Sequence, residues 1–239
     1  MVRKLAYSVS EREHWISASG GLLGILAVLW VSHVWLGGHG GVLAVASMGA
    51  SAVLLFAAPH GTLSQPWPVF GGNMVSAVIG VTSQHWLGAE PMLAASVAVA
   101  LAIAAMYSLR CLHPPGGATA LYAVLGGEKV HALGYGYVFS PVLLNVVVLL
   151  AIAVAYNYPF AWRRYPQCWY RRSQGQVRTR PAEESMIPHS SLVYALSQID
   201  TFVDVSEEDL QRIYALALGQ SHPVSRAVPA PAAATGSAR

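Results

Sequence analysis

Charge is what this sequence of 239 residues has least of. Only 10% of its residues are charged and 54% are hydrophobic, whereas a soluble domain is nearer a quarter charged. No Lys or Arg occurs in the 96 residues from His14 to Leu109. Between residues 14 and 158 the charged residues are Arg110, Lys129, Glu90 and Glu128. The deficit excludes an ordinary soluble domain and predicts a membrane domain that crosses the bilayer several times.

Enzyme motifs and cysteines are scarce as well. There is no P-loop, no dinucleotide fingerprint, no H-E-x-x-H and no G-x-S-x-G. The two cysteines, Cys111 and Cys168, cannot form a disulfide framework and predict free thiols in a reducing compartment. Cys111 and His113 alone are too few ligands to suggest a metal site. We therefore expect no enzymatic activity, no cofactor and no metal.

Long apolar runs dominate what is present. A membrane-spanning helix needs about 20 apolar residues. Five apolar runs reach this length. A sixth run, 116–125, is too short to cross alone, and predicts a half-helix, a re-entrant element or the start of a longer span. The expected fold class is all-α: a transmembrane helical bundle of five full spans plus a short or broken helix, with a small helical cytoplasmic tail. The five full runs are 16–36, 42–58, 69–87, 92–109 and 137–156.

The cations that do occur cluster after the last apolar run. By the positive-inside rule this flank is cytoplasmic, and the basic N-terminal flank favours the same side. Two cytoplasmic ends require an even number of crossings, which favours six; five crossings would place the N-terminus outside. The expected location is therefore a bacterial inner membrane, with the lipid bilayer and not nucleic acid as the partner of the arginines. They are Arg163, Arg164, Arg171, Arg172, Arg178 and Arg180.

The composition also divides the chain into segments. A polar lead-in, 1–15, precedes the transmembrane domain, 16–158. An Arg-rich juxtamembrane linker, 159–189, follows it, and 190–218 predicts two short amphipathic helices. The Ala-, Pro- and Ser-rich segment 219–239 has the composition of a disordered tail.

Small residues recur every four positions in three of the apolar runs. In lipid, such stripes let helix backbones approach closely, because packing rather than hydrophobicity drives association there. The pattern predicts one tight bundle, and contacts in a homo-oligomer could use the same stripes. The stripes are Gly20 and Gly24; Gly72, Ser76 and Gly80; and Ala94, Ala98 and Ala102.

The strongest functional candidate is the segment from Arg110 to Gly117, Arg-Cys-Leu-His-Pro-Pro-Gly-Gly. Pro114 and Pro115 stop the preceding helix. Gly116 and Gly117 have no Cβ, so a ligand could approach their N–H groups at the start of a following helix, where unsatisfied donors and the helix dipole favour an anion.

Three side chains add to this candidate site. Arg110 offers a bidentate fork, His113 a donor or a pH-sensitive gate, and Thr119 a hydroxyl. These groups favour a small anion over a cation. The structural alternative is that Arg110 is an ordinary interfacial anchor and the prolines only a helix stop.

A polar loop between two apolar runs, residues 59–73, forms a second candidate. If six helices cross, this loop and the Arg110 segment face the same side and could form one vestibule or gate. The alternative is a plain connecting loop. Its possible ligand donors are His60, Thr62, Ser64, Gln65 and Asn73.

The run from Leu112 to Leu121, Leu-His-Pro-Pro-Gly-Gly-Ala-Thr-Ala-Leu, resembles the signature of the HPP family of integral membrane proteins, named for the tripeptide at 113–115. The stretch from Ser64 to Gly80 resembles the family's other marked segment, and the likeness covers roughly residues 14 to 158. The resemblance implies a compact helical membrane domain. Some chloroplast and cyanobacterial members transport nitrite. Many bacterial members carry nucleotide-binding CBS domains, for which this tail is too short.

We therefore expect a transporter or channel for a small inorganic anion, with nitrite as the leading candidate substrate. Two other classes compete with it. One is a non-transporting membrane scaffold or sensor that recruits a cytosolic partner through the segment 190–218. The other is an enzyme acting on a lipid or quinone, which the scarcity of carboxylates disfavours.

Overall fold

A computed structural model describes residues 11–36 and 45–169 of the chain. The chain divides into two compact units, 1–177 and 178–239, and every described residue lies in the first. The predicted amphipathic helices within 190–218 and the tail 219–239 lie outside the described residues.

The described residues form helices and no strand, which confirms the all-α class. A short 3-10 turn, η1 (Thr62–Ser64), precedes the third helix, and a π-helical segment, η2 (Val138–Leu143), precedes the last. The α-helices are α1 (Glu11–Leu36), α2 (Val45–Ala57), α3 (Pro66–Leu87), α4 (Pro91–Ser108), α5 (Pro114–Leu125), α6 (Glu128–His131) and α7 (Leu144–Asn157).

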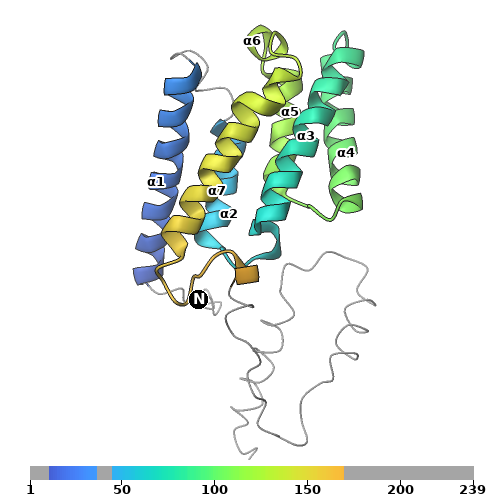
Figure 1. Cartoon of the computed structure of the whole chain (residues 1–239). Helices are drawn as coiled ribbons and strands as arrows, with labels where there is room; N and C mark the ends of the chain where they lie inside the picture. The colour runs from blue at the N-terminus through green and yellow to red at the C-terminus, as the bar shows by residue number, and fades with distance from the viewer. Residues whose placement is uncertain (1–10, 37–44, 170–239) are drawn as a thin grey trace, which may run out of the picture. The chain divides into compact units, whose positions relative to one another are not determined.

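The helices α1, α2, α3, α4, α5 and α7 alternate in direction along the chain (Figure 1). The end of α7 therefore meets the start of α1, and the start of α5 meets the start of α3. We call this the motif end of the bundle. With only 12 residues, α5 is about 18 Å long. It nevertheless runs alongside α3 as one of six alternating helices, as the six-crossing alternative requires.

Three described helices are long and apolar enough to cross a membrane: Glu11–Trp35, Pro91–Ser108 and Val138–Asn157. The apolar helix Ala46–Ala57 is shorter. The remaining predicted span, α3, has 22 residues, but polar side chains interrupt it at Asn73, at Ser76 and from Thr82 to His85. The length and composition expected of a full span thus hold for three of the five predicted spans.

Proline determines where several helices begin or bend. α3, α4 and α5 each have proline in the first turn, where the missing N–H has no intrahelical partner to lose. Pro141 lies inside η2, where Ser140 departs from helical dihedral angles. The last span therefore bends at Pro141, near its start.

One half of the bundle, α3 with α4 and α5, packs through small residues. A Cβ at Gly80 would lie 2.6 Å from the carbonyl oxygen of Ala120. Ala94, Ala98 and Ala102 are fully buried on the facing side of α4. Both predicted stripes in this half therefore lie at helix contacts. We call α3, α4 and α5 the small-residue half.

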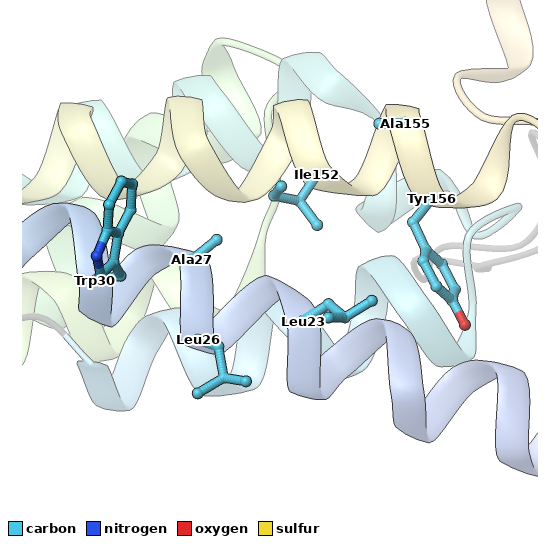
Figure 2. Close-up of a pocket in the computed structure, with 7 residues that line it drawn as sticks. All are labelled: Leu23, Leu26, Ala27, Trp30, Ile152, Ala155 and Tyr156. Atoms are coloured by element: carbon cyan, nitrogen blue, oxygen red, sulfur yellow. The ribbon is translucent and has the colours of Figure 1, made fainter.

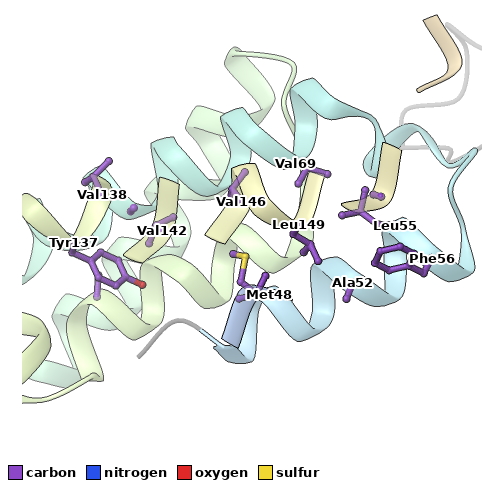
Figure 3. Close-up of a cluster of buried hydrophobic side chains, with 14 of the residues drawn as sticks. Met48, Ala52, Leu55, Phe56, Val69, Tyr137, Val138, Val142, Val146 and Leu149 are labelled. Carbon is purple, nitrogen blue, oxygen red and sulfur yellow. The ribbon is translucent and has the colours of Figure 1, made fainter. Parts of the chain in front are cut away.

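The other half, α1 with α2 and α7, packs through large side chains. Met48, Leu55 and Phe56 of α2 meet Leu149 of α7 in a fully buried cluster (Figure 3). The predicted Gly20–Gly24 stripe of α1 receives the ring of Phe56, which would lie only 2.6 Å from a Cβ at Gly20 and 2.7 Å from one at Gly24. We call α1, α2 and α7 the large-side-chain half.

Candidate functional site

The candidate site begins where α4 ends. The Cys111 N–H donates to the Met106 carbonyl at 2.9 Å and the Arg110 N–H to that of Tyr107 at 3.1 Å, a Schellman motif. Arg110 occupies its left-handed position with φ 52°, where glycine is usual. Trp67 of α3 donates its indole N–H to the Leu109 carbonyl at 3.1 Å. The α4 terminus is thus tied to α3, while the Arg110 side chain is exposed.

His113 is fully buried at the start of α5 and joins three segments. Its Nδ1 lies 3.0 Å from the carbonyl oxygen of Leu63, which can only accept, so Nδ1 donates. Nε2 is then the acceptor for the Ser51 hydroxyl of α2, at 2.8 Å. Both ring nitrogens of a neutral imidazole are satisfied by the protein itself. His113 holds α2, the 59–65 loop and α5 together.

The two glycines after the prolines have different surroundings. The Gly116 N–H donates to the His113 carbonyl at 2.8 Å. A Cβ at Gly116 would lie 2.8 Å from the Gly72 carbonyl oxygen and 2.9 Å from the Ser76 hydroxyl, so this glycine allows α5 to touch α3. Gly117 is half-buried, and a Cβ there would meet no atom within 4 Å. The space beside the start of α5 is therefore open at Gly117 and closed at Gly116.

A buried polar pair continues from the motif into the bundle. The Thr119 hydroxyl donates to Oδ1 of Asn73 on α3 at 2.6 Å, and both residues are fully buried. Asn73 in turn donates to the Val69 carbonyl at 2.8 Å. Tyr137, just before η2, donates to the Thr119 carbonyl at 3.2 Å. Two predicted site residues, Asn73 and Thr119, are thus in direct contact.

The 59–65 loop is held by its own polar side chains. The Ser64 hydroxyl donates to the Leu54 carbonyl at 3.1 Å, and Nε2 of Gln65 donates to the carbonyls of Pro59 and Gly61. Burial raises the pKa of the Tyr165 phenol, so it stays protonated and donates to the Ser64 carbonyl at 2.8 Å. Ser64 and Gln65 shape this loop through these bonds.

The two predicted clusters meet at the motif end. The contacts His113 to Leu63 and Trp67 to Leu109 join the 59–73 segment to the α4–α5 junction. Within the α4–α5 junction the residues separate by depth: Arg110 and Pro114 are exposed, whereas His113 and Pro115 are buried. His60, in the 59–65 loop, is half-buried, and its carbonyl accepts from Nε2 of Gln167 at 2.8 Å. Arg110 and His113 therefore do not form a paired anion clamp; one faces outward and the other supports the junction.

The candidate site lies within a segment that matches a known family. Residues 6–166 match the HPP transmembrane region. The chain belongs to the HPP transmembrane family. The match includes the whole motif end and both loops of the candidate site.

Similar curated proteins include two transmembrane proteins of Dictyostelium discoideum. One is 36% identical over 132 residues, which are 54% of this chain and 42% of the relative. The other is 36% identical over 129 residues, 53% of this chain and 45% of the relative. The chain therefore spans less than half the length of these relatives. No solved structure matches.

The HPP match ends at residue 166, just after Arg163. The position of Arg163 after the last apolar run predicts that its side chain is solvated. Arg163 is 1% exposed. Its guanidinium pairs with Glu13 of α1 and donates to the Phe56 carbonyl of α2. It also donates to the Ser17 hydroxyl at 3.1 Å and to Oδ1 of Asn157 at 3.1 to 3.2 Å. The expectation of a juxtamembrane anchor is corrected: Arg163 closes the large-side-chain half.

Asn145 of α7 lies outside the predicted site and is fully buried. Its Oδ1 accepts from the Ser32 hydroxyl of α1 at 2.6 Å. Its Nδ2 has no hydrogen-bond partner among the described residues. A buried amide donor without a partner costs about 1–3 kcal/mol, so it is a natural contact for a water or a solute.

Proposed function

We propose that this HPP protein transports a small inorganic anion across the membrane. The observation that supports this most is the chemistry of the buried polar side chains. Among the described residues they are hydroxyls, amides, one imidazole and one guanidinium, with no buried carboxylate. Polar groups inside a membrane bundle mark solute pathways, and this set contains none of the carboxylates that a cation path uses.

Arg110 is the proposed entry residue. Its exposed guanidinium lies at the junction where two loops meet, and it occupies a left-handed backbone position that costs a non-glycine residue about 1–2 kcal/mol. Strain retained at an exposed position is an argument for function. The open space beside Gly117 would let a ligand approach the start of α5, and His113 maintains the junction.

Deeper in the bundle, Asn145 is the proposed contact near the opposite end. Its Nδ2 donor has no partner among the described residues, and it lies on α7 just past the bend at Pro141. Thr119 and Asn73 occupy the interior between the two ends. Nitrite is the leading substrate candidate, because the donors suit a small planar oxyanion.

The test is flux in proteoliposomes that contain the full chain, with nitrite, nitrate and chloride offered separately. We expect Arg110→Ala to lower nitrite flux about fivefold, the value of one solvated charge contact at about 4 Å, and Arg110→Lys to retain most of it. Lys129→Gln, an exposed cation on α6, is the control for net charge. Equal flux in wild type, Arg110→Ala and empty liposomes would refute transport of these anions.

We further propose that the motif end faces the cytoplasm of a bacterial cell, as its arginines favour. Cys168 is exposed at this end and Cys111 is buried. A membrane-impermeant maleimide should therefore leave Cys168 unlabelled in spheroplasts and label it after lysis. Cys168→Ser provides the background signal. Labelling of Cys168 in intact spheroplasts would reverse the orientation.

A further inference from the structure

A groove of ≈ 690 Å³ runs between α1 and α7 on the outside of the large-side-chain half. It is almost entirely apolar, and Figure 2 shows Trp30 at one end and Tyr156 at the other. Trp30 is 70% exposed, so its indole can contact a molecule bound in the groove. The other lining residues are Leu23, Leu26, Ala27, Ile152 and Ala155.

The length of the groove matches one leaflet of a bilayer. From Ser19, whose hydroxyl lies 2.6 Å from that of Tyr156, to Trp30 is 11 residues, or about 16 Å of helix. Half of a hydrocarbon core of ~30 Å is ~15 Å. The Tyr156 hydroxyl also donates to the Ile16 carbonyl at 2.9 Å, which closes the groove at this end.

Cations lie just beyond the closed end. Along α1 the positions 12, 16, 19, 23, 26 and 30 alternate in steps of four and three, so Arg12 shares a helix face with Leu23, Leu26 and Trp30. Its guanidinium carbon lies 4.9 Å from the ring centroid of Trp162. That of Arg164 lies 5.9 Å from the ring of Tyr158, just after α7.

Charge at this end is not neutralised. Arg12 and Arg164 are exposed, whereas Glu13 is taken up by the buried Arg163. The other acid of this helix turn, Glu11, is exposed. It directly precedes Arg12 in the sequence and is therefore not on the helix face that lines the groove. At this end of the groove, the described residues therefore present two exposed arginines, Arg12 and Arg164, against one exposed acid, Glu11.

We propose that this groove binds an anionic phospholipid, with one acyl chain between α1 and α7 and the phosphate at Arg12 and Arg164. Basic residues beside a cleft between membrane helices suit such headgroups. A second copy is the competing occupant. A twofold contact through this face would bring both pairs of arginines together at the same membrane level, where like charges repel. The phosphate of a lipid would neutralise the two arginines, whereas a second copy would bring further positive charge beside them.

Native mass spectrometry of the full chain in detergent tests this, with phosphatidylglycerol and phosphatidylcholine of identical acyl chains as probes. We expect phosphatidylglycerol to bind more tightly. Arg12→Gln with Arg164→Gln should weaken it about 30-fold, since each cation near an anionic lipid contributes about fivefold, and should leave phosphatidylcholine unchanged. Ala155→Trp should displace both lipids by filling the groove. Glycerol phosphate should not compete, because it lacks the chain.

Matched controls are Lys129→Gln for charge and Ala104→Trp for bulk, both exposed residues away from the groove. Equal phosphatidylglycerol affinity in wild type and the double arginine variant would overturn the proposal. So would an Ala155→Trp variant that converts a dimer to a monomer while its lipid affinities stay unchanged, because a second copy would then be the occupant. Exposed positions are chosen so that every variant folds, which unaltered thermal unfolding would confirm.

Discussion

The two halves of the bundle hold their helices together differently. In the small-residue half, α3, α4 and α5 meet backbone to backbone through glycine and alanine. In the large-side-chain half, α1, α2 and α7 are spaced by Phe56, Leu149 and Tyr156, and the buried Arg163 bonds to both α1 and α2. In the first half, close backbone contact also brings the Thr119 hydroxyl to Oδ1 of Asn73. In the second, the multidentate Arg163 joins helices that large side chains hold apart.

The most damaging test of this contrast removes the partner of that cation. Glu13→Gln leaves the buried Arg163 guanidinium without its counter-charge, and breaking a buried pair in this way costs about 3 kcal/mol. Thermal unfolding in detergent, followed by tryptophan fluorescence, would show a clearly lowered midpoint. Glu11→Gln removes an exposed acid two residues away and should change nothing measurable. Equal effects of the two substitutions would mean that the Arg163–Glu13 pair does not stabilise the large-side-chain half.

The next test adds one methyl group to each half. Gly80→Ala forces a Cβ to within 2.6 Å of the Ala120 carbonyl, a backbone atom that cannot rotate away, and should cost about 2 kcal/mol. Gly21→Ala on α1 meets no atom within 4 Å and should be neutral or slightly stabilising. The same unfolding assay compares them. A tolerated Gly80→Ala would mean that α3 and α5 are not in backbone contact.

A smaller effect is expected where the halves join. Ser51→Ala on α2 removes the donor to Nε2 of His113 and leaves a buried acceptor unsatisfied, at about 1–2 kcal/mol. Ser96→Ala is the control, because its hydroxyl is exposed and bonds only to its own helix, at the Met92 carbonyl. An unfolding midpoint equal to that of the control would show that His113 does not join α2 to α5.

The smallest effect has the opposite sign. Arg110→Gly should stabilise the protein by about 1 kcal/mol, because glycine adopts φ 52° without strain, while anion flux falls. Arg110→Ala keeps the Cβ and should lower flux without the gain in stability. Both are measured by thermal unfolding and by proteoliposome flux. If Arg110→Gly lost stability, the side chain would have a structural role instead.

The fold was more accessible from the sequence than the site. Apolar runs predicted the helices, Pro114 and Pro115 predicted the end of α4, and four-residue spacing predicted the Gly80 contact, because backbone and packing chemistry are local in sequence. Arg163 was wrongly predicted to be a solvated flank residue, because the positive-inside rule interprets a cation only by its position in the sequence. Its partner Glu13 is 150 residues away, so no local pattern indicates the pair. Ser51 was missed because a serine in an apolar helix has no local signature.

The Arg163 contacts also set an order of events during synthesis. The residues that surround the guanidinium belong to α1, to the end of α2 and to the end of α7. Ribosomes add residues one after another, so α1 and α2 enter the membrane well before their arginine exists. Until residue 163 emerges, Glu13 lacks its ion pair with Arg163, and the Phe56 carbonyl lacks this donor. The large-side-chain half is therefore completed last, although it contains the first helices made.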